Sequence, residues 1–363
     1  MNEFEEKQLV INEFMAVHKI DALVLHTVSS FSWATCGAAS YINIASTTGE
    51  ASLVITSEKK FLVTNNIERP RMSVEEKLEN QGWEIIETLW YQQNDVIADL
   101  TRGLKTGTDI SGTRYKDLSE ALARTRAVLT PSAGEHFRVL GRQCAQAMNA
   151  AAHSVRPGMT EFEIAGMMAH ELEKRGVQMT VNLVGTDERI FAYRHPLPTA
   201  KKLQRYAMLI FCGRWKGLVC SITRLVHFGA VPEEVRQKAN ATAHIDAHFI
   251  EQTRPGKRVG EIFQHAVNEY AAMGFPDEWK KHHQGGPVGY EPREYLARPD
   301  STEEVTLGQV YAWNPSITGV KSEDTILISE ENNEILTEIE GWPTIATKVN
   351  GRSYQRPDIL EVT

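Results

Sequence analysis

Three residues of this chain have the side chains and the surroundings that acid–base chemistry requires. His195 lies in RHPLPT, His283 in HHQGGPVGY and Glu323 in SEDTILI. An imidazole has a reference pKa of about 6.5, so His195 could take a proton from water and return it to a leaving nitrogen. A glutamate in an apolar run requires a partner, because an unpaired buried charge is costly. Glu323 is therefore expected to anchor a cationic or N–H-rich substrate, or to orient an imidazole.

Each of these residues also has a structural explanation, which the sequence leaves open. His195 could cap a strand from its proline-rich loop, and His283 could be satisfied by neighbouring polar groups. The partner of Glu323 could be Arg224, in a structural ion pair. His282, next to His283, is expected to face solvent.

A hairpin is expected to position this chemistry. Residues 206–229, YAMLIFCGRWKGLVCSITRLVHFG, contain two β-rich apolar runs on either side of GRWKG, which is typical of a tight turn. Side chains alternate between the two faces of a strand. One face of each arm therefore carries Met208, Ile210 and Cys212 in the first, and Val219, Ser221 and Thr223 in the second.

Residues 1 to about 130 are expected to form a small α/β domain. A charged helix through His18 is followed by four apolar runs at residues 21–26, 51–56, 59–64 and 83–88, with helical stretches between and after them. The segment SSFSWATCG, residues 29–37, is expected to be a solvated loop, with a ligand loop as the alternative. Pro131 to Gly134 interrupts the pattern before a helix over 135–154. The predicted domains are residues 1–131 and 132–363.

A repeated sequence motif indicates a duplication in the second domain. RPGMTEFEI at residues 156–164 returns as RPGKRVGEI at residues 254–262, 98 positions later. In both copies a Pro-Gly turn follows one helix and precedes another. If the motif is a true repeat, the domain consists of two half-domains related by a pseudo-two-fold axis, with the site between them.

Composition and charge exclude several classes of function. The 363 residues carry a net charge of −8, and the short Lys/Arg clusters provide no footprint for nucleic acid. The acidic start MNEFEEKQLV and the absence of a long apolar run predict a cytoplasmic protein that does not bind membranes. The four cysteines are too sparse for a disulfide scaffold.

The order and spacing of these motifs resemble peptidase family M24, the pita-bread hydrolases, and within it the branch of creatinase, prolidase and aminopeptidase P. The motifs are RHPLPT, SITR at residues 221–224, HHQGGPVGY, YAWNP and SEDTILI. The resemblance covers the whole chain. It implies an α/β (α+β) protein in which a small creatinase-type domain precedes a pita-bread domain with duplicated halves. It also implies a homodimer.

The metallopeptidases of this family hold two divalent metals with five ligands: two Asp, one His and two Glu. When the family pattern is anchored on Gly217, Thr223 and Arg224, the two Asp positions fall on Ile210 and Ser221. The other ligand positions are matched by His283 three residues before Gly286, by Asn314 before Pro315 and by Glu323 before Asp324. One histidine and one carboxylate offer too few anionic donors for two cations. The expectation is therefore no catalytic metal and no other cofactor.

Creatinase hydrolyses a C–N bond without metal, and its catalytic histidine is similar to His195. Creatinase has a second Glu where this chain has Thr223, which argues against creatine as the substrate. The resemblance implies a metal-independent hydrolase of a C–N bond in a small polar metabolite, such as an amide, an amidine or an amino-acid derivative. The expected catalytic residues are His195, His283 and Glu323, and the expected substrate-binding residues are Tyr290, Asn314, Ser221, Arg224 and Arg293. Arg293 lies in YEPREY, residues 290–295, which is expected to be a strand beside the site.

Two alternatives remain open at this point. The chain could be a catalytically degenerate relative of Xaa-Pro dipeptidases that acts as a binding protein. It could also be an Xaa-Pro peptidase, if the ligand positions above are shifted in register.

Overall fold

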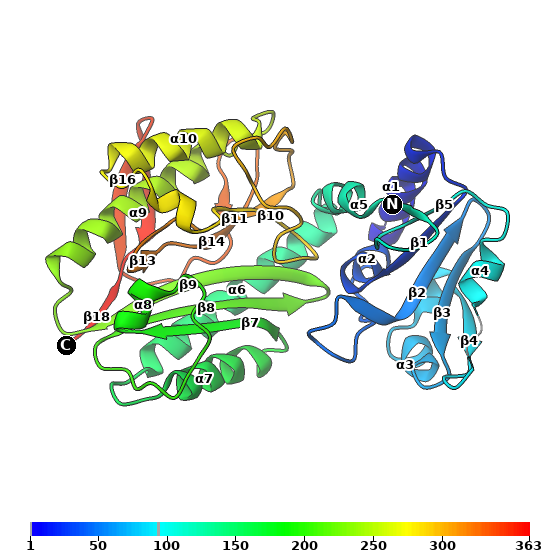
Figure 1. Ribbon diagram of the computed structural model, residues 1–363, viewed down its shortest axis with the longest axis horizontal. Helices are drawn as coiled ribbons and strands as arrows, with labels where there is room; N and C mark the ends of the chain where they lie inside the picture. The colour runs from blue at the N-terminus through cyan, green and yellow to red at the C-terminus, as the bar shows by residue number, and fades with distance from the viewer. Residues whose placement is uncertain (1, 93–94) are drawn as a thin grey trace. The chain divides into compact units, whose positions relative to one another are not determined.

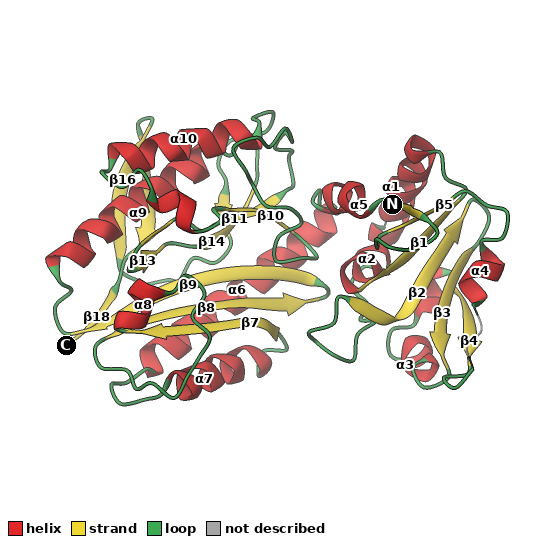
Figure 2. Cartoon of the chain, in the orientation of Figure 1, coloured by secondary structure: helices red, strands yellow, loops and turns green. Residues whose placement is uncertain are grey.

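The computed structural model of the protein describes residues 2–92 and 95–363. Packing divides the chain into two compact units: unit 1 comprises residues 1–133 and 216–218, and unit 2 comprises residues 134–215 and 219–363. Figures 1 and 2 show that each unit combines helices with strands. The predicted α/β class is confirmed. No helix in the described ranges is both long enough and apolar enough to span a bilayer.

Unit 1 is built on a six-stranded mixed sheet with the order β4-β3-β2-β1-β5-β6. The central strand β1 runs antiparallel to β2 and parallel to β5. The four strands predicted from apolar runs are β1 to β4, which confirms this part of the prediction. The elements of unit 1 are α1 (Glu3–His18), β1 (Ala22–Thr27), α2 (Val28–Ala34), β2 (Thr48–Thr56), β3 (Lys60–Asn65), α3 (Arg69–Val74), η1 (Leu78–Gln81), β4 (Glu84–Thr88), α4 (Val96–Leu100), β5 (Thr106–Thr108), β6 (Lys116–Asp117) and α5 (Ser119–Arg126).

The segment at residues 29–37 is not the solvated loop that the sequence suggested. Most of it belongs to α2, and every residue of α2 is buried. The helix begins directly after β1, where the hydroxyl of Thr27 accepts a hydrogen bond from the backbone N–H of Ser30. The three serines suggested an exposed loop, but Ser30 and Ser32 make internal hydrogen bonds and remain in the core.

Unit 2 contains two four-stranded sheets, with the orders β18-β9-β8-β7 and β10-β11-β14-β15. Helix α7 packs on β7, and α9 packs on β16 and on α10 (Figure 1). The elements of unit 2 are α6 (Pro131–Ser154, which begins at the boundary), α7 (Glu161–Glu173), β7 (Gln178–Thr186), α8 (Glu188–Ala192), β8 (Tyr206–Trp215), β9 (Leu218–Phe228), α9 (Glu233–Gln252), α10 (Val259–Ala272), η2 (Glu278–Lys281), β10 (Gly285–Val288), β11 (Val310–Trp313), β12 (Ser316–Ile317), β13 (Val320–Lys321), β14 (Asp324–Leu327), β15 (Glu334–Ile335), β16 (Thr344–Val349), β17 (Arg352–Pro357) and β18 (Leu360–Val362). Pro131 starts α6 rather than interrupting the chain before it, because proline is well suited to the first turn of a helix.

The predicted hairpin is formed by β8 and β9. Its turn residues Lys216 and Gly217 both have positive φ, 49° and 76°. This is the pattern of a type I′ turn, whose twist matches that of the two strands it joins. The strands are buried along almost their whole length, so side chains on both faces are packed.

The two copies of the repeated sequence motif make the same pattern of backbone hydrogen bonds. In the first copy, the N–H of Gly158 donates to the carbonyl of Leu203, and the N–H of Leu203 donates to the carbonyl of Met159. In the second copy, Gly256, Val305 and Lys257 repeat these two bonds, each within 2.8–2.9 Å. Single β-bridges join Thr160 to Lys202 and Arg258 to Glu304 in the same way. Both halves of unit 2 therefore use one supersecondary unit, as the repeat predicted.

Glu161, in the first turn of α7, anchors the segment that leads to His195. It is fully buried, and its Oε1 accepts hydrogen bonds from the N–H and hydroxyl of Thr186 and from Nε of Arg189. Its Oε2 accepts from the N–H and hydroxyl of Thr199. The two ends of the 186–199 segment are thus attached to one carboxylate.

We predict that Glu161→Ala lowers the free energy of unfolding by about 3–5 kcal/mol, because it leaves Arg189 and several buried donors without their acceptor. Chemical denaturation of the purified variant measures the effect. Glu261→Ala, at an exposed position on α10, is the control and should leave the midpoint nearly unchanged. An unfolding midpoint of Glu161→Ala equal to that of the control would contradict the anchoring role.

Candidate functional site

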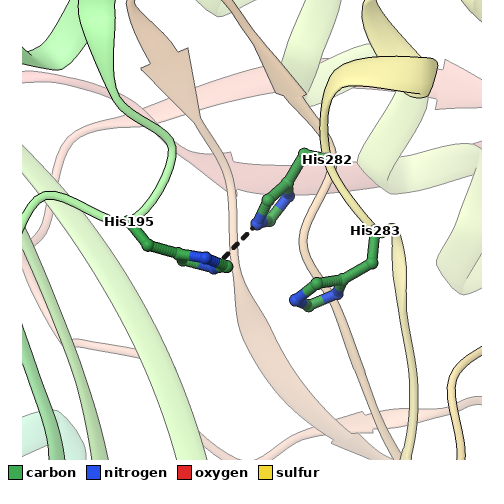
Figure 3. A group of neighbouring side chains, drawn as sticks. All are labelled: His195, His282 and His283. Carbon is green, nitrogen blue, oxygen red and sulfur yellow. Dashed lines mark hydrogen bonds between the residues drawn. The ribbon is translucent and has the colours of Figure 1, made fainter.

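Three histidines from two segments of unit 2 meet at the candidate site. His195 lies in the loop between α8 and β8, and His282 and His283 follow η2. Nε2 of His282 lies 3.0 Å from Nε2 of His195 (Figure 3). The His283 ring stacks on His282 and lies 5.6 Å from His195 between ring centroids. The structure brings together the two histidines that the sequence singled out, with His282 between them.

His282 was expected to face solvent, and that expectation is wrong. Its side chain is buried, whereas His195 is exposed. The sequence could not separate two adjacent histidines by exposure, because the backbone after η2 is extended and turns successive side chains to different sides. Nδ1 of His282 and Nδ1 of His283 are buried without a hydrogen-bond partner among the described residues.

Ion pairs hold the two histidine-bearing segments against each other. Arg194, the neighbour of His195, donates to Glu278 in η2, and Thr318 donates to Glu278 through its N–H at 2.8 Å. Burial would raise the pKa of Glu278, but hydrogen bonds from Lys281, Thr318 and Arg194 lower it to about 2. On the other side of His282, the side-chain amide of Gln284 donates to the His282 carbonyl at 2.7 Å.

The three imidazoles are held in their neutral form. Burial, and then the charge of Lys321, lower the pKa of His282 to about 2. Burial, followed by Arg293 and Lys321, lowers the pKa of His283 to about 4. The pKa of His195 is also lowered, by its partial burial and by Lys321, with Glu323 acting in the opposite direction. A neutral imidazole can accept a proton or bind a metal, but it does not attract an anion by charge.

Glu323 is buried, and both of its carboxylate oxygens are bound by neighbouring side chains. Its Oε1 lies 2.9 Å from a guanidinium nitrogen of Arg293, and its Oε2 lies 3.0 Å from Nζ of Lys321. The Thr223 hydroxyl donates to Oε2 at 2.6 Å. Burial would raise the pKa of Glu323, but the two cations and this hydrogen bond hold the pKa far below its usual range. The carboxylate is charged and has no exposed oxygen to offer a cationic substrate.

Arg224, the structural alternative considered as a partner for Glu323, pairs instead with the carboxylate of Asp324. A guanidinium nitrogen of Arg224 lies 2.8 Å from Oδ1 of Asp324, and Arg356 binds Oδ2 of the same carboxylate at 2.6 Å. Arg356 also binds Asp246 at 2.8 Å. These four side chains form a buried ionic network beneath the site. Since successive residues of a strand point to opposite faces, Glu323 and Asp324 serve different networks.

Arg293 is the predicted site residue that the structure places closest to Glu323. One guanidinium nitrogen binds Glu323 and another donates to the Ser221 hydroxyl at 3.2 Å. The segment YEPREY was expected to be a strand, but it consists of bends after β10. Pro292 explains this difference, because it has no N–H to donate to a sheet. The irregular backbone turns Arg293 inward.

Ser221 and Asn314 are both buried polar residues near the middle of unit 2. Ser221 contacts Sγ of Cys212 at 3.2 Å across the hairpin. Asn314 has a side-chain oxygen that is buried without a hydrogen-bond partner within the described ranges. Tyr290 is also buried, and its N–H donates to Glu294 at 2.8 Å. Of the predicted substrate-binding residues, Arg293 binds the Glu323 carboxylate directly, and Ser221 is joined to it through Arg293.

Two glycines after His283 are required by close packing. A Cβ on Gly285 would lie 2.1 Å from the carbonyl oxygen of Ala312, and a Cβ on Gly286 would lie 2.5 Å from the carbonyl oxygen of Tyr295. Gly285 pairs with Trp313 where β10 runs beside β11. The glycine pair therefore allows the strand after the histidines to approach its neighbour.

Lys321 was not identified from the sequence, although it is central to the site. It lies two residues before Glu323, a spacing that places both side chains on one face of an extended segment. That spacing is the signal that could have revealed it. Lys321 also lines a small pocket together with Met208, His282 and Ser316.

The three histidines offer one possible set of metal ligands. Their ring nitrogens lie within 4.8 Å of one another. Three imidazoles can hold one zinc-type ion. Two cations, Lys321 and Arg293, lie close enough to lower the pKa values of these rings, and they would also repel a metal ion there.

Comparison with known proteins places this architecture in a family. The family model described as metallopeptidase family M24 matches residues 135–330, which is more than half of the chain. The chain therefore belongs to metallopeptidase family M24, and the predicted family is confirmed.

Its relatives are peptidases by description. The chain is 26% identical over 232 residues to an uncharacterized peptidase of Staphylococcus haemolyticus, over 61% of this chain and 66% of that protein. It is 28% identical over 195 residues to one of Staphylococcus epidermidis, over 51% and 55%. The chain thus spans less than two thirds of either relative. An Xaa-Pro dipeptidase of Pyrococcus horikoshii is 24% identical over 94% of this chain and 99% of its own length.

Solved structures confirm the predicted pita-bread type of fold. The prolidase of Pyrococcus horikoshii OT3 has a TM-score of 0.79 at 20% identity, over 92% of this chain and 99% of its own. An Xaa-Pro dipeptidase from Bacillus anthracis also has a TM-score of 0.79, at 16% identity, over 99% and 100%. At these identities the likeness establishes the fold and leaves the activity open.

We predict that Lys321→Met raises the pKa values of His195, His282 and His283 toward 6.5, because the substitution removes a cation that disfavours their protonation. NMR titration of the imidazole carbon-bound protons measures these values. Lys280→Met, an exposed lysine on η2, is the control and should leave all three unchanged. Unchanged titration in Lys321→Met would contradict the electrostatic account.

Proposed function

We propose that this M24 protein is a metal-independent hydrolase of a C–N bond in a small polar metabolite that carries a carboxylate. The observation that carries the proposal is the pair of ion pairs that the Glu323 carboxylate forms with Arg293 and Lys321. Family M24 is a metallopeptidase family, so the donor set must be tested against a metal pair. The residues at the expected ligand positions do not fit one.

At four of the five expected metal-ligand positions, the side chain is a poor ligand for a divalent ion. Ile210 belongs to an apolar cluster of the core. Ser221 and Asn314 are neutral, and Glu323 is already neutralised by two cations. Pairs of divalent ions require several anionic oxygen donors, because they must replace hydration and offset mutual repulsion. Two side-chain cations already provide the positive charge that this carboxylate requires.

The proposed mechanism relies on His195 as the general base. A neutral imidazole takes a proton from water, the water attacks the carbon of the C–N bond, and the protonated imidazole returns the proton to the leaving nitrogen. Nε2 of His195 faces Nε2 of His282 at 3.0 Å, so His282 orients the ring and its tautomer. The lowered pKa keeps His195 unprotonated, and thus competent as a base, at neutral pH.

The charge of the site favours an anionic substrate. Two cations and one carboxylate leave an excess of one positive charge, since the three imidazoles are neutral. Arg293 can pair with a substrate carboxylate through its planar fork of donors. This revises the expected role of Glu323: it positions Arg293 and Lys321 and does not bind a cationic substrate itself. Arg224, which is bound to Asp324, has a structural role.

A second candidate is a binding protein without catalysis. The small pocket beside His282 is lined in part by apolar residues, including Met208 and Val320. At about 10 Å³ this cavity has room for about one water, which favours a site that has lost its reaction. An Xaa-Pro peptidase is the third candidate, because relatives carry that name. Turnover and its dependence on metal separate the three.

We predict that protein treated with EDTA hydrolyses a carboxylate-bearing substrate as fast as untreated protein does. The assay is amine release from a panel of N-acyl amino acids, guanidino acids and Xaa-Pro dipeptides. Cleavage of Xaa-Pro dipeptides that appears only after Mn²⁺ or Co²⁺ is added would establish the peptidase instead. Saturable binding of a panel member with no turnover would establish the binding protein.

We predict that His195→Ala lowers kcat by about 10²- to 10⁴-fold, the usual contribution of a general base. His170→Ala, at an exposed position of α7, is the matched control. Because the pKa of His195 is below its ordinary 6.5, kcat should be flat above pH 6.5 and fall only at lower pH as the ring is protonated. A kcat of His195→Ala within tenfold of the wild type would remove His195 from the mechanism.

A further inference from the structure

A second cluster of histidines lies on α9 and α10, outside the candidate active site. His244 and His248 are four residues apart on α9, and His265 and Glu269 are four residues apart on α10. Residues at this spacing share one face of a helix. The two helices pack side by side (Figure 1), so the two pairs face each other.

The distances within this cluster are close to those of a metal site. Nε2 of His244 lies 2.9 Å from Oε2 of Glu269, and Nε2 of His248 lies 3.6 Å from the same oxygen. The ligand atoms of His244, His248 and Glu269 all lie within 4.8 Å of one another. Bonds of 2.0–2.1 Å in a tetrahedral zinc site separate the ligand atoms by about 3.3 Å. Small side-chain movements would therefore be enough to accept an ion.

The remaining ring nitrogens have partners that suit metal binding. Nδ1 of His248 lies 2.9 Å from Nε2 of His265, and Nδ1 of His244 lies 3.4 Å from the hydroxyl of Thr347 on β16. A histidine that binds a metal through Nε2 carries its proton on Nδ1, and an acceptor there fixes the tautomer and the ring orientation. Both histidines have such a partner, which comes from a different element in each case.

The identity of the donors selects the type of ion. Two imidazoles and one carboxylate suit zinc and neighbouring late transition metals, whereas Mg²⁺ and Ca²⁺ prefer sites made of oxygen. The three side chains are only partly exposed, so they are not ordinary surface histidines. Three protein ligands also leave the fourth position of a tetrahedral ion for water.

We propose that His244, His248 and Glu269 form a binding site for a single zinc-type divalent cation, with His265 as a positioning residue. The bound ion would join α9 to α10 and so stabilise the second half of unit 2. The site is separate from the histidines of the candidate active site, and it does not depend on the function proposed above.

The test is zinc titration of the full-length, metal-stripped protein by isothermal calorimetry. The wild type should bind one equivalent of Zn²⁺, and its melting temperature should rise as zinc is added. His248→Ala and Glu269→Gln should each abolish the uptake. His265→Ala should weaken binding by about tenfold to a hundredfold, as expected for a residue that orients a ligand.

His283→Ala and the surface variant His170→Ala are the controls, and both should bind zinc as the wild type does. Zinc uptake that is lost in His283→Ala but retained in His248→Ala and Glu269→Gln would overturn the proposal and place the ion at the candidate active site. No uptake by the wild type would also overturn it. Circular dichroism of each metal-free variant shows whether it is folded, and His248→Gln replaces His248→Ala if the latter is not.

Discussion

The neutralisation of one buried carboxylate is the interaction on which the candidate site depends. Glu323 is held in the interior of unit 2 by Arg293 and Lys321. Breaking a buried ion pair leaves an uncompensated charge, at a cost of about 3–5 kcal/mol. The three side chains must therefore remain together. Burial, reinforced by the excess positive charge of this cluster, lowers the pKa values of the neighbouring histidines and keeps them neutral.

The fold supplies rigidity through further carboxylates that are buried or half-buried. Glu161 joins the two ends of the segment that carries His195, and Glu278 joins that segment to η2. Asp324 binds two arginines beneath the site. In each case one acidic side chain connects elements that are distant in sequence. A site on loops gains precision when such contacts fix the loops.

The local patterns of the sequence predicted much of the architecture. Alternating apolar runs indicated the strands of unit 1, and Lys216-Gly217 indicated the hairpin turn, because these signals depend only on neighbouring residues. The repeat at Pro-Gly turns indicated two similar halves, which the hydrogen bonds confirm. The failures were α2 and the YEPREY segment, where burial and a proline outweighed local propensity.

What the sequence by itself determined was therefore the fold family and the chemical types of the site residues, since periodicity, turn residues and motif order are local properties of the chain. Only the tertiary structure decided which residue is paired with which. In the folded chain Glu323 pairs with Arg293 and Lys321, Arg224 pairs with Asp324, and His282 is buried. These pairings depend on side-chain direction and on segments up to about a hundred residues apart. The energy of a buried charge depends on such contacts, which no spacing along the chain can specify.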